Sequence, residues 1–275
     1  MKVAIAGSSG FVGSELKKHF HNVIEVKREH FKNNDFSTLK DCDVLINLCG
    51  APIIQRWSEK IKKEILTSRI DTTRQLVNAI ENTSIKHFIS TSAVGYYQDE
   101  EQFDEYNAKN SNDFLGQLTK QWEEEALRAK IPTTILRFGI VLDKKGGALQ
   151  KMFTPFSLGL GGNIGDGKAW FSWIDLFDLI SMFHFVIEKK LTGIINATSP
   201  NPIKNEEFTK KLGKTLKKPT FFTVPQWVLR VIFSEGSTAL TSSKRIVPTR
   251  LIESGFLFKY DTIEKSLNRT INDMF

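Results

Sequence analysis

Cysteine is scarce in this sequence, and long apolar runs are missing from it. The two cysteines, Cys42 and Cys49, are too far apart for a CxxC redox motif and have no partner pair for zinc. No apolar run approaches the ~20 residues that a membrane span requires. Met1-Lys2 lead straight into a strand-like run instead of a secretory signal. We therefore expect no membrane partner and a cytoplasmic location, where thiols stay reduced.

The sequence also lacks any concentration of basic residues. Its formal net charge is +7, yet the lysines lie in scattered pairs such as Lys62-Lys63 and Lys217-Lys218. Nucleic-acid-binding proteins usually gather basic residues into a patch or stripe, so no nucleic-acid partner is expected. The five histidines are equally dispersed, without the spacing of metal ligands. We therefore expect no metal site, and we interpret the lysines as a solvated surface.

What the sequence does contain is an alternation of short apolar runs with segments of helical period. The runs fall at residues 3–6, 23–26, 44–49, 87–91 and 133–142. This order predicts a mostly parallel sheet covered by helices on both faces. The pattern changes after about Lys145, where a glycine-rich stretch, GLGGNIGDG, follows. We predict an α/β protein with a Rossmann-type, doubly wound parallel sheet over residues 1–150 and a smaller C-terminal α+β substrate domain over residues 151–275.

Polar residues mark the starts of several predicted helices. Ser58, Asp113 and Asn205 each precede a segment whose apolar residues recur with helical spacing. The side-chain oxygens of such residues accept hydrogen bonds from the first free N–H groups of a helix. We therefore expect all three to act as helix caps.

The stretch AIAGSSGFVGSEL joins the first predicted strand to the first predicted helix. Its glycines have the spacing GxxGxxG, in the setting that a dinucleotide-binding loop requires. The first allows a tight turn, the second lets the backbone approach a pyrophosphate, and the third lets the helix pack close to the sheet. An ordinary strand–helix turn is the alternative. The residues predicted to contact a cofactor here are Gly7, Ser8, Ser9, Gly10, Phe11, Val12 and Gly13.

The end of the second predicted strand indicates which dinucleotide would bind. An NAD-binding protein usually places Asp or Glu about twenty residues past the first glycine, where it contacts the adenosine ribose. This sequence has Lys27-Arg28 there. Two cations attract the 2′-phosphate of NADP(H), which an acidic residue would repel. The sequence therefore predicts NADP(H) as the cofactor, with simple surface charge as the alternative.

Several stretches, taken in order, resemble one known family. They are GSSGFVG, INLCGAPI, RWSEKIKKEILTSRIDTT, STSAVGYY, WEEEA, LRFGIVLDKKGGAL, SWIDLFDL and RIVPTRLIESGFLFKY. The chain resembles an extended short-chain dehydrogenase/reductase, and more narrowly the sugar-nucleotide-epimerase-like group labelled "epimerase family protein". The resemblance implies a Rossmann-type cofactor domain followed by a smaller substrate domain.

The resemblance also implies cofactor contacts outside the glycine loop. Leu48-Cys49-Gly50 would line the adenosine and phosphate side, and Asp35 would lie near the adenine edge. Residues of the following helix would reach the cofactor too, although Arg69 could equally form a surface ion pair. The end of the 133–142 strand is where the superfamily contacts the nicotinamide. The full set implied in this way is Asp35, Leu48, Cys49, Gly50, Glu64, Arg69, Thr91, Arg137 and Gly139.

The catalytic residues of that superfamily are only partly present. Its members use Ser or Thr together with Tyr and Lys spaced YxxxK, and Ser92 matches the serine position. The YxxxK slots fall near Leu115 and Thr119, which cannot replace the pair. Tyr96 or Tyr97 would supply a phenol near the nicotinamide, with Tyr96 as the chosen candidate and a role as pocket lining as the alternative for both.

Two functions are consistent with these residues. The first is an NADP(H)-dependent oxidoreductase or epimerase acting on a small, sugar-nucleotide-like substrate, with the cofactor supplying the chemistry. The second is an NADPH-binding sensor or regulatory protein without turnover, which the missing YxxxK pair would explain. A homodimer is compatible with either function.

Overall fold

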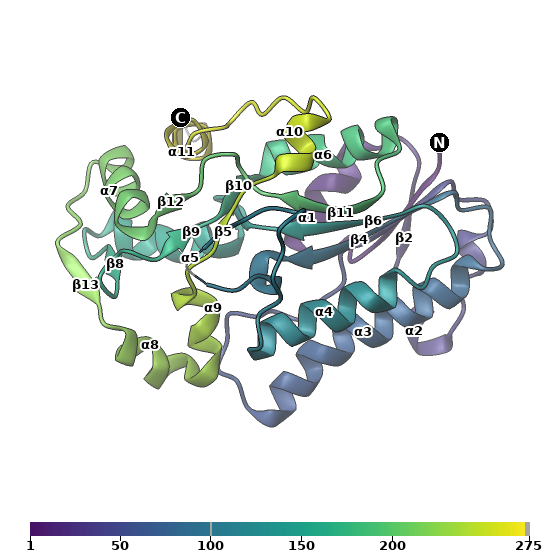
Figure 1. The fold of residues 1–275 in the computed structure, drawn as a ribbon, viewed down its shortest axis with the longest axis horizontal. Coiled ribbons are helices and arrows are strands. Elements are labelled where there is room, and N and C mark those ends of the chain that lie inside the picture. The colour runs from purple at the N-terminus through teal and green to yellow at the C-terminus, as the bar shows by residue number, and fades with distance from the viewer. Residues whose placement is uncertain (100, 273–275) are drawn as a thin grey trace.

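Six parallel strands form the central sheet of the computed structural model, which describes residues 1–99 and 101–272 (Figure 1). Their spatial order is β2-β1-β3-β4-β6-β11, and every neighbouring pair is parallel. This confirms the Rossmann-type sheet that the alternating pattern predicts. The strands are β1 (Val3–Ala6), β2 (Val23–Val26), β3 (Val44–Asn47), β4 (His87–Ala93), β6 (Thr133–Phe138) and β11 (Gly193–Ala197).

Helices cover both faces of this sheet, as the alternation of side chains along β1 illustrates. Val3 and Ile5 are buried in one core with residues of α1 (Phe11–Leu16) and α6 (Leu176–Lys189). Ala4 and Ala6 are buried in a second core, with residues of α3 (Glu59–Ile80) and α4 (Phe114–Ala126). Successive strand residues point to opposite faces, so a continuous apolar run of this kind fits a strand buried on both sides. Figure 1 shows α3 and α4 running together beneath the sheet.

Two of the three predicted helix caps are confirmed. Ser58 accepts a hydrogen bond from the Ile61 N–H at 3.4 Å, and Asp113 accepts one from the Gly116 N–H at 2.7 Å. The cap at Asn205 is wrong, because α7 (Asn205–Leu216) already includes this residue. Its carboxamide oxygen instead accepts the N–H of Ile164 at 2.9 Å, which ties α7 to β8 (Gly162–Ile164).

The run at 133–142, predicted as one strand, is divided at Gly139. A Cβ at this glycine would lie 2.9 Å from the carbonyl oxygen of Ser172, so another chain segment passes too close for a side chain. The Gly139 N–H donates to the carbonyl of Ala197 in the main sheet, whereas the Ile140 N–H donates to that of Ser172. The chain therefore leaves the sheet at this point, and β7 (Ile140–Asp143) pairs with β10 (Trp173–Asp175).

The C-terminal region has a mixture of short strands and helices and its own apolar core, which includes Trp173, Phe208 and Leu267. The residues after 150 do not all belong to this region, because β11 joins the main sheet and α6 packs against it. The domain boundary therefore stays a prediction. The other elements are α2 (Arg28–Asn33), β5 (Gln102–Phe103), α5 (Gly147–Ser157), β9 (Trp170–Phe171), β12 (Ile203–Lys204), β13 (Phe222–Val224), α8 (Gln226–Phe233), α9 (Thr238–Thr241), β14 (Arg245–Ile246), α10 (Thr249–Glu253) and α11 (Ile263–Asn272).

None of the helices in the described part of the chain combines the length and the apolar character that crossing a membrane would need.

Candidate cofactor and substrate site

A cavity of about 510 Å³ opens at the carboxyl ends of the central strands. Its walls include Gly7 and Gly10 after β1, and Leu48 and Gly50 after β3. The strands β1 and β3 are neighbours in the sheet, but the chain continues from β1 to β2 on one side and from β3 to β4 on the other. Such a switch point is where open α/β sheets bind their ligands.

The glycine loop is shaped by close backbone packing. A Cβ at Gly13 would lie 2.2 Å from the carbonyl oxygen of Gly7, and one at Gly7 would lie 2.8 Å from that of Leu48. Gly7 also has a φ of +82°, in the region that favours glycine. A Cβ at Gly10 would meet only the Gly7 oxygen, at 3.3 Å. Gly7 and Gly13 therefore serve the turn and the packing of α1, while Gly10 leaves open the approach of a ligand.

Arg69 is a buried cation in the wall of the same cavity. Its guanidinium donates to the carbonyl oxygens of Ala51 and Ile65, at 2.9 and 3.2 Å, and lies 5.3 Å from the centre of the Trp122 ring. Burial lowers its pKa to about 10. Among the described residues it has no carboxylate partner, so the alternative, a surface ion pair, is not formed. A glycine cradle beside an uncompensated cation fits the phosphates of a dinucleotide.

Lys27 and Arg28 lie on the surface at the end of β2, next to the glycine loop in the sheet. Neither has an ion-pair partner in the described part of the chain.

Sequence reasoning missed Glu25, two residues before Lys27. Its carboxylate accepts a hydrogen bond from the Ser8 hydroxyl at 2.6 Å and pairs with Lys17 at 3.3 Å. These bonds lower the pKa of Glu25, and Lys17 balances its charge.

Most of the residues predicted to contact a cofactor meet at this cavity, together with the predicted catalytic residue Ser92. Those in its wall are Gly7, Gly10, Phe11, Val12, Gly13, Leu48, Cys49, Gly50, Arg69, Thr91, Ser92 and Gly139. Burial raises the pKa of the Cys49 thiol to about 12, so this residue lines the wall as an unreactive apolar group.

Other predicted site residues lie outside the wall. Asp35 is exposed and accepts the Ser37 N–H at 3.0 Å, and Glu64 is exposed on α3. The full set outside the wall is Ser8, Ser9, Lys27, Arg28, Asp35, Glu64, Tyr96 and Arg137.

Ser92, at the end of β4, begins a buried chain of polar groups. Its hydroxyl donates to one carboxylate oxygen of Glu123 at 2.6 Å. Arg137 donates to both oxygens of that carboxylate, at 2.8 and 2.7 Å. Burial opposes the charge on Arg137, but its bonds with Glu123 outweigh this and raise its pKa above the ordinary value.

The side chain of Arg137 is thus bound to Glu123, and the nicotinamide contact that the resemblance implies at this strand end stays a prediction. Arg137 pairs with Ser92 in the register of β4 and β6, which directs its side chain to the sheet face covered by α4. Its guanidinium lies 3.5 Å from the centre of the Tyr96 ring. That stacking also occupies Tyr96, which lies outside the wall of the cavity.

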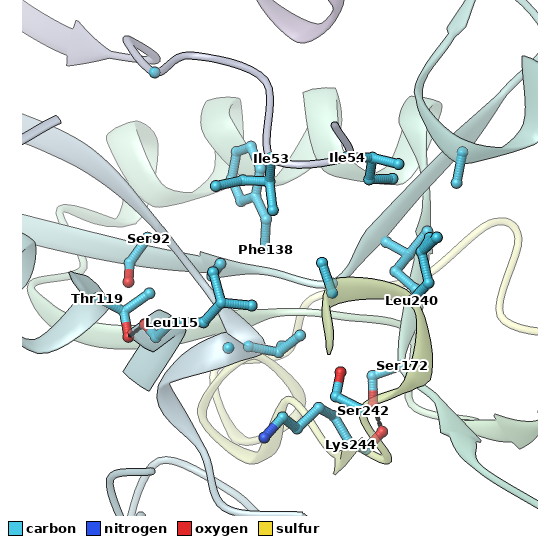
Figure 2. Close-up of a pocket in the computed structure, with 18 of the residues that line it drawn as sticks. Ile53, Ile54, Ser92, Leu115, Thr119, Phe138, Ser172, Leu240, Ser242 and Lys244 are labelled. Atoms are coloured by element: carbon cyan, nitrogen blue, oxygen red, sulfur yellow. Dashed lines mark hydrogen bonds between the residues drawn. The ribbon is translucent and has the colours of Figure 1, made fainter. Parts of the chain in front are cut away.

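The two positions that the resemblance assigns to the YxxxK pair carry no catalytic groups. Leu115 and Thr119 line the cavity from α4, close to Ser92 in Figure 2. The Thr119 hydroxyl donates to the Leu115 carbonyl oxygen at 2.8 Å, so it is used within the helix. Ser92 is thus the candidate for handling a substrate oxygen that the resemblance and the geometry both support.

The C-terminal region supplies the opposite part of the wall, where Figure 2 shows Leu240, Ser242 and Lys244. Sequence reasoning missed these residues. Lys244 is buried, donates to the Tyr97 carbonyl oxygen and pairs with Asp99 at 2.8 Å. No short motif marks Lys244, because its partners come from a distant part of the chain. In the described residues, no group of three or more His, Cys, Asp or Glu is placed to hold a metal ion.

A Rossmann-type sheet with a glycine cradle at its switch point, and with Ser92 facing the same cavity, defines a dinucleotide-binding protein of the short-chain dehydrogenase/reductase type. The family model described as "NAD dependent epimerase/dehydratase family" matches residues 3–197. The chain belongs to this family. A second model, "Domain of unknown function (DUF1731)", matches residues 224–270, within the C-terminal region.

Relatives and solved structures agree with this assignment. The chain is 35% identical to the "Epimerase family protein SDR39U1 homolog, chloroplastic" of Arabidopsis thaliana, over 97% of this chain and 86% of that protein. It is 33% identical to the "Epimerase family protein YfhF" of Bacillus subtilis, over 99% of each. The crystal structure of human epimerase family protein SDR39U1 with NADPH superposes with a TM-score of 0.93 at 29% identity, covering 100% of both chains.

A more distant likeness shows the fold alone. The UDP-glucuronic acid 4-epimerase of Bacillus cereus, solved in complex with NAD, has a TM-score of 0.76 at 18% identity over 97% of this chain and 96% of that one.

Proposed function

We propose that this protein is an NADP(H)-dependent oxidoreductase or epimerase that acts on a small-molecule substrate. The observation that carries the proposal is the single cavity that joins the glycine cradle to Ser92 and to the C-terminal wall. The human relative crystallised with NADPH supports this choice of cofactor. We further propose a cytoplasmic protein without a nucleic-acid or membrane partner, and leave a homodimer as a prediction.

The residues present fit the cofactor, and the chain's own groups have assignable tasks. Gly10 and the start of α1 would receive the pyrophosphate, with Arg69 as a nearby positive charge. Bound NADPH supplies a hydride, which together with a proton from water converts a carbonyl group into an alcohol. Ser92 donates to Glu123, so its oxygen can accept a hydrogen bond from a substrate hydroxyl and orient it. Arg137 holds the Glu123 carboxylate in that position.

The substitution Ser92→Ala tests the proposed reaction. We expect kcat for hydride transfer to fall about 100-fold, the usual cost of removing one polar group that positions a reacting oxygen. The dissociation constant for NADPH should stay unchanged, because Ser92 is not part of the phosphate cradle. The measurements are NADPH oxidation followed by absorbance across a panel of carbonyl compounds, and NADPH titration by fluorescence.

Ser254 provides a matched control, because it is exposed and lies outside the wall of the cavity. Ser254→Ala should therefore leave turnover unchanged. Turnover that is untouched by Ser92→Ala would remove the catalytic role of Ser92.

A second substitution tests the preference for NADP(H). We expect Arg28→Ala to weaken NADPH binding about tenfold, which is typical for the loss of one charge-assisted hydrogen bond. NADH binding should stay the same, because NADH has no 2′-phosphate. Lys32, an exposed cation on the same helix α2, is the matched control through Lys32→Ala. Equal affinity of the unaltered protein for the two cofactors would contradict the preference.

A sensor without turnover is the second candidate function, and one observation favours it. Leu115 and Thr119 occupy the YxxxK slots, and the Thr119 hydroxyl is bound within its own helix. Such a protein would bind NADPH in the same cavity and oxidise none of it. Tight NADPH binding without turnover on a broad substrate panel would favour this alternative.

A further inference from the structure

The part of the cavity formed by residues 147–244, here called the substrate half, has several large apolar side chains in its wall. Met152 lines it from α5, Trp170 and Phe171 from β9, and Leu240 from α9. These residues come from segments that are distant in the sequence and converge only in the folded chain. Apolar side chains of this kind stabilise the apolar surface of a ligand.

Charged groups are few in the substrate half, and the one cation there is already paired. Asp166 and Lys244 are the only charged side chains among the described residues that line it. Lys244 is bound to Asp99 at 2.8 Å and to the carbonyl oxygen of Tyr97. Asp166 is negative and would repel an anion. A diphosphate needs cations or free N–H groups to replace its hydration, and the substrate half offers it neither a free Arg nor a free Lys.

Two cations outside the wall of the substrate half, Arg245 and Lys204, face an aromatic ring instead of the cavity. A third outside the wall, Lys168, pairs with Asp166 at 3.9 Å. Arg245 stacks on Trp170 with its guanidinium 4.3 Å from the ring centre, and the Lys204 ammonium lies 5.8 Å from the same ring. Neither side chain is in the wall of the cavity. A phosphate-bearing ligand would therefore have to recruit its cations from outside the wall.

Most polar groups of the substrate half are used by the protein itself. The Ser172 hydroxyl donates to the carbonyl oxygen of Lys244 at 2.6 Å and accepts the N–H of Ile246 at 2.9 Å. The Asn205 carboxamide oxygen accepts the N–H of Ile164. Ser242 differs, because its hydroxyl has no partner among the described residues and is directed toward the middle of the cavity in Figure 2. The Ser242 hydroxyl suits one polar atom of a ligand, and the exposed Gln226 carboxamide is another lining group that has no hydrogen bond among the described residues.

We infer that the substrate half binds a small, uncharged carbonyl compound with an apolar body, and not a sugar nucleotide. This rests on the proposed function, because the same cavity must also hold the nicotinamide end of the cofactor. A volume of about 510 Å³ shared in this way favours a compact substrate. The free Ser242 hydroxyl is the group that donates to its carbonyl oxygen, and Leu240 and Trp170 pack against its apolar body. The Ser92 oxygen, whose proton is given to Glu123, accepts from the hydroxyl of the alcohol form.

The experiment separates cofactor binding from substrate binding. NADPH is first titrated into the protein by fluorescence, and failure to bind would overturn the proposed function itself. The NADPH-saturated protein is then titrated calorimetrically with acetophenone, with 2-octanone and with UDP-glucose. We expect binding of at least one ketone and none of UDP-glucose at millimolar concentration. Binding of UDP-glucose alone, or of neither class, would overturn the inference while the NADPH result stands.

Two variants locate the bound ketone. Leu240→Trp fills space in the substrate half and should weaken ketone binding about tenfold or more, while NADPH affinity stays the same. Arg245→Gln, outside the wall, should leave ketone binding unchanged. Ketone affinity that does not respond to Leu240→Trp, or UDP-glucose binding that Arg245→Gln abolishes, would show that the inference is wrong. Thermal unfolding of both variants with NADPH bound confirms that each is folded.

Discussion

Gly13→Ala is expected to destabilise the whole protein. The added Cβ would lie 2.2 Å from the carbonyl oxygen of Gly7, a distance that no side-chain rotation can relieve because both groups are backbone-fixed. Overpacking of this kind costs about 3 kcal/mol. In a chain of this size, that loss lowers Tm by roughly 6–12 °C. NADPH binding should be lost as well, since α1 can no longer start close to β1. Thermal unfolding and NADPH titration measure the two effects.

Gly10→Ala is the matched control in the same loop. It should weaken NADPH binding without lowering the stability of the fold. Its Cβ would meet only the Gly7 oxygen, at 3.3 Å, and the backbone φ of −74° suits any residue. The fold should therefore keep its stability, while the new methyl group stands where a pyrophosphate would approach. An equal loss of stability in both variants would contradict the different roles of the two glycines. Normal NADPH binding by Gly10→Ala would contradict the assignment of the cradle.

The fold was predictable because local patterns determine it. The strands β1 and β2 occupy the same residues as the predicted runs, since a continuous apolar segment between turns identifies a buried strand. The glycine loop was predictable for a similar reason, because its requirements concern neighbouring backbone atoms. The break at Gly139 was missed, because it depends on the approach of Ser172 from the C-terminal region.

The polar partners in the site were not predictable from local patterns. Ser92 and Glu123 are 31 positions apart in the chain, and Lys244 and Tyr97 are 147 positions apart. Only the packing of α4 against β4 brings the first pair together. One signal was available, since Glu123 stands beside Trp122 on the buried face of α4. A charged residue on a buried helix face requires a partner, and Arg137 provides it.

Glu123→Gln should lower both the free energy of unfolding and the rate of turnover. Arg137 is 3% exposed, and its guanidinium would keep its charge in the core without a carboxylate. Breaking one side of a buried ion pair costs about 3–5 kcal/mol. Urea unfolding at neutral pH measures this loss. The control is Glu124→Gln on the same helix, where Glu124 and its partner Lys120 are both exposed and the pair contributes about 1 kcal/mol or less.

A double variant distinguishes a purely structural role of Glu123 from its effect on Ser92. Glu123→Leu combined with Arg137→Met removes both charges, and apolar replacement of a buried pair is often neutral for stability. We expect the free energy of unfolding to recover while kcat stays low, because the Ser92 hydroxyl still lacks the acceptor that orients it. KM should change less than kcat, since the substrate half is untouched. If turnover recovers together with stability, Glu123 contributes only to the fold and Ser92 acts without it.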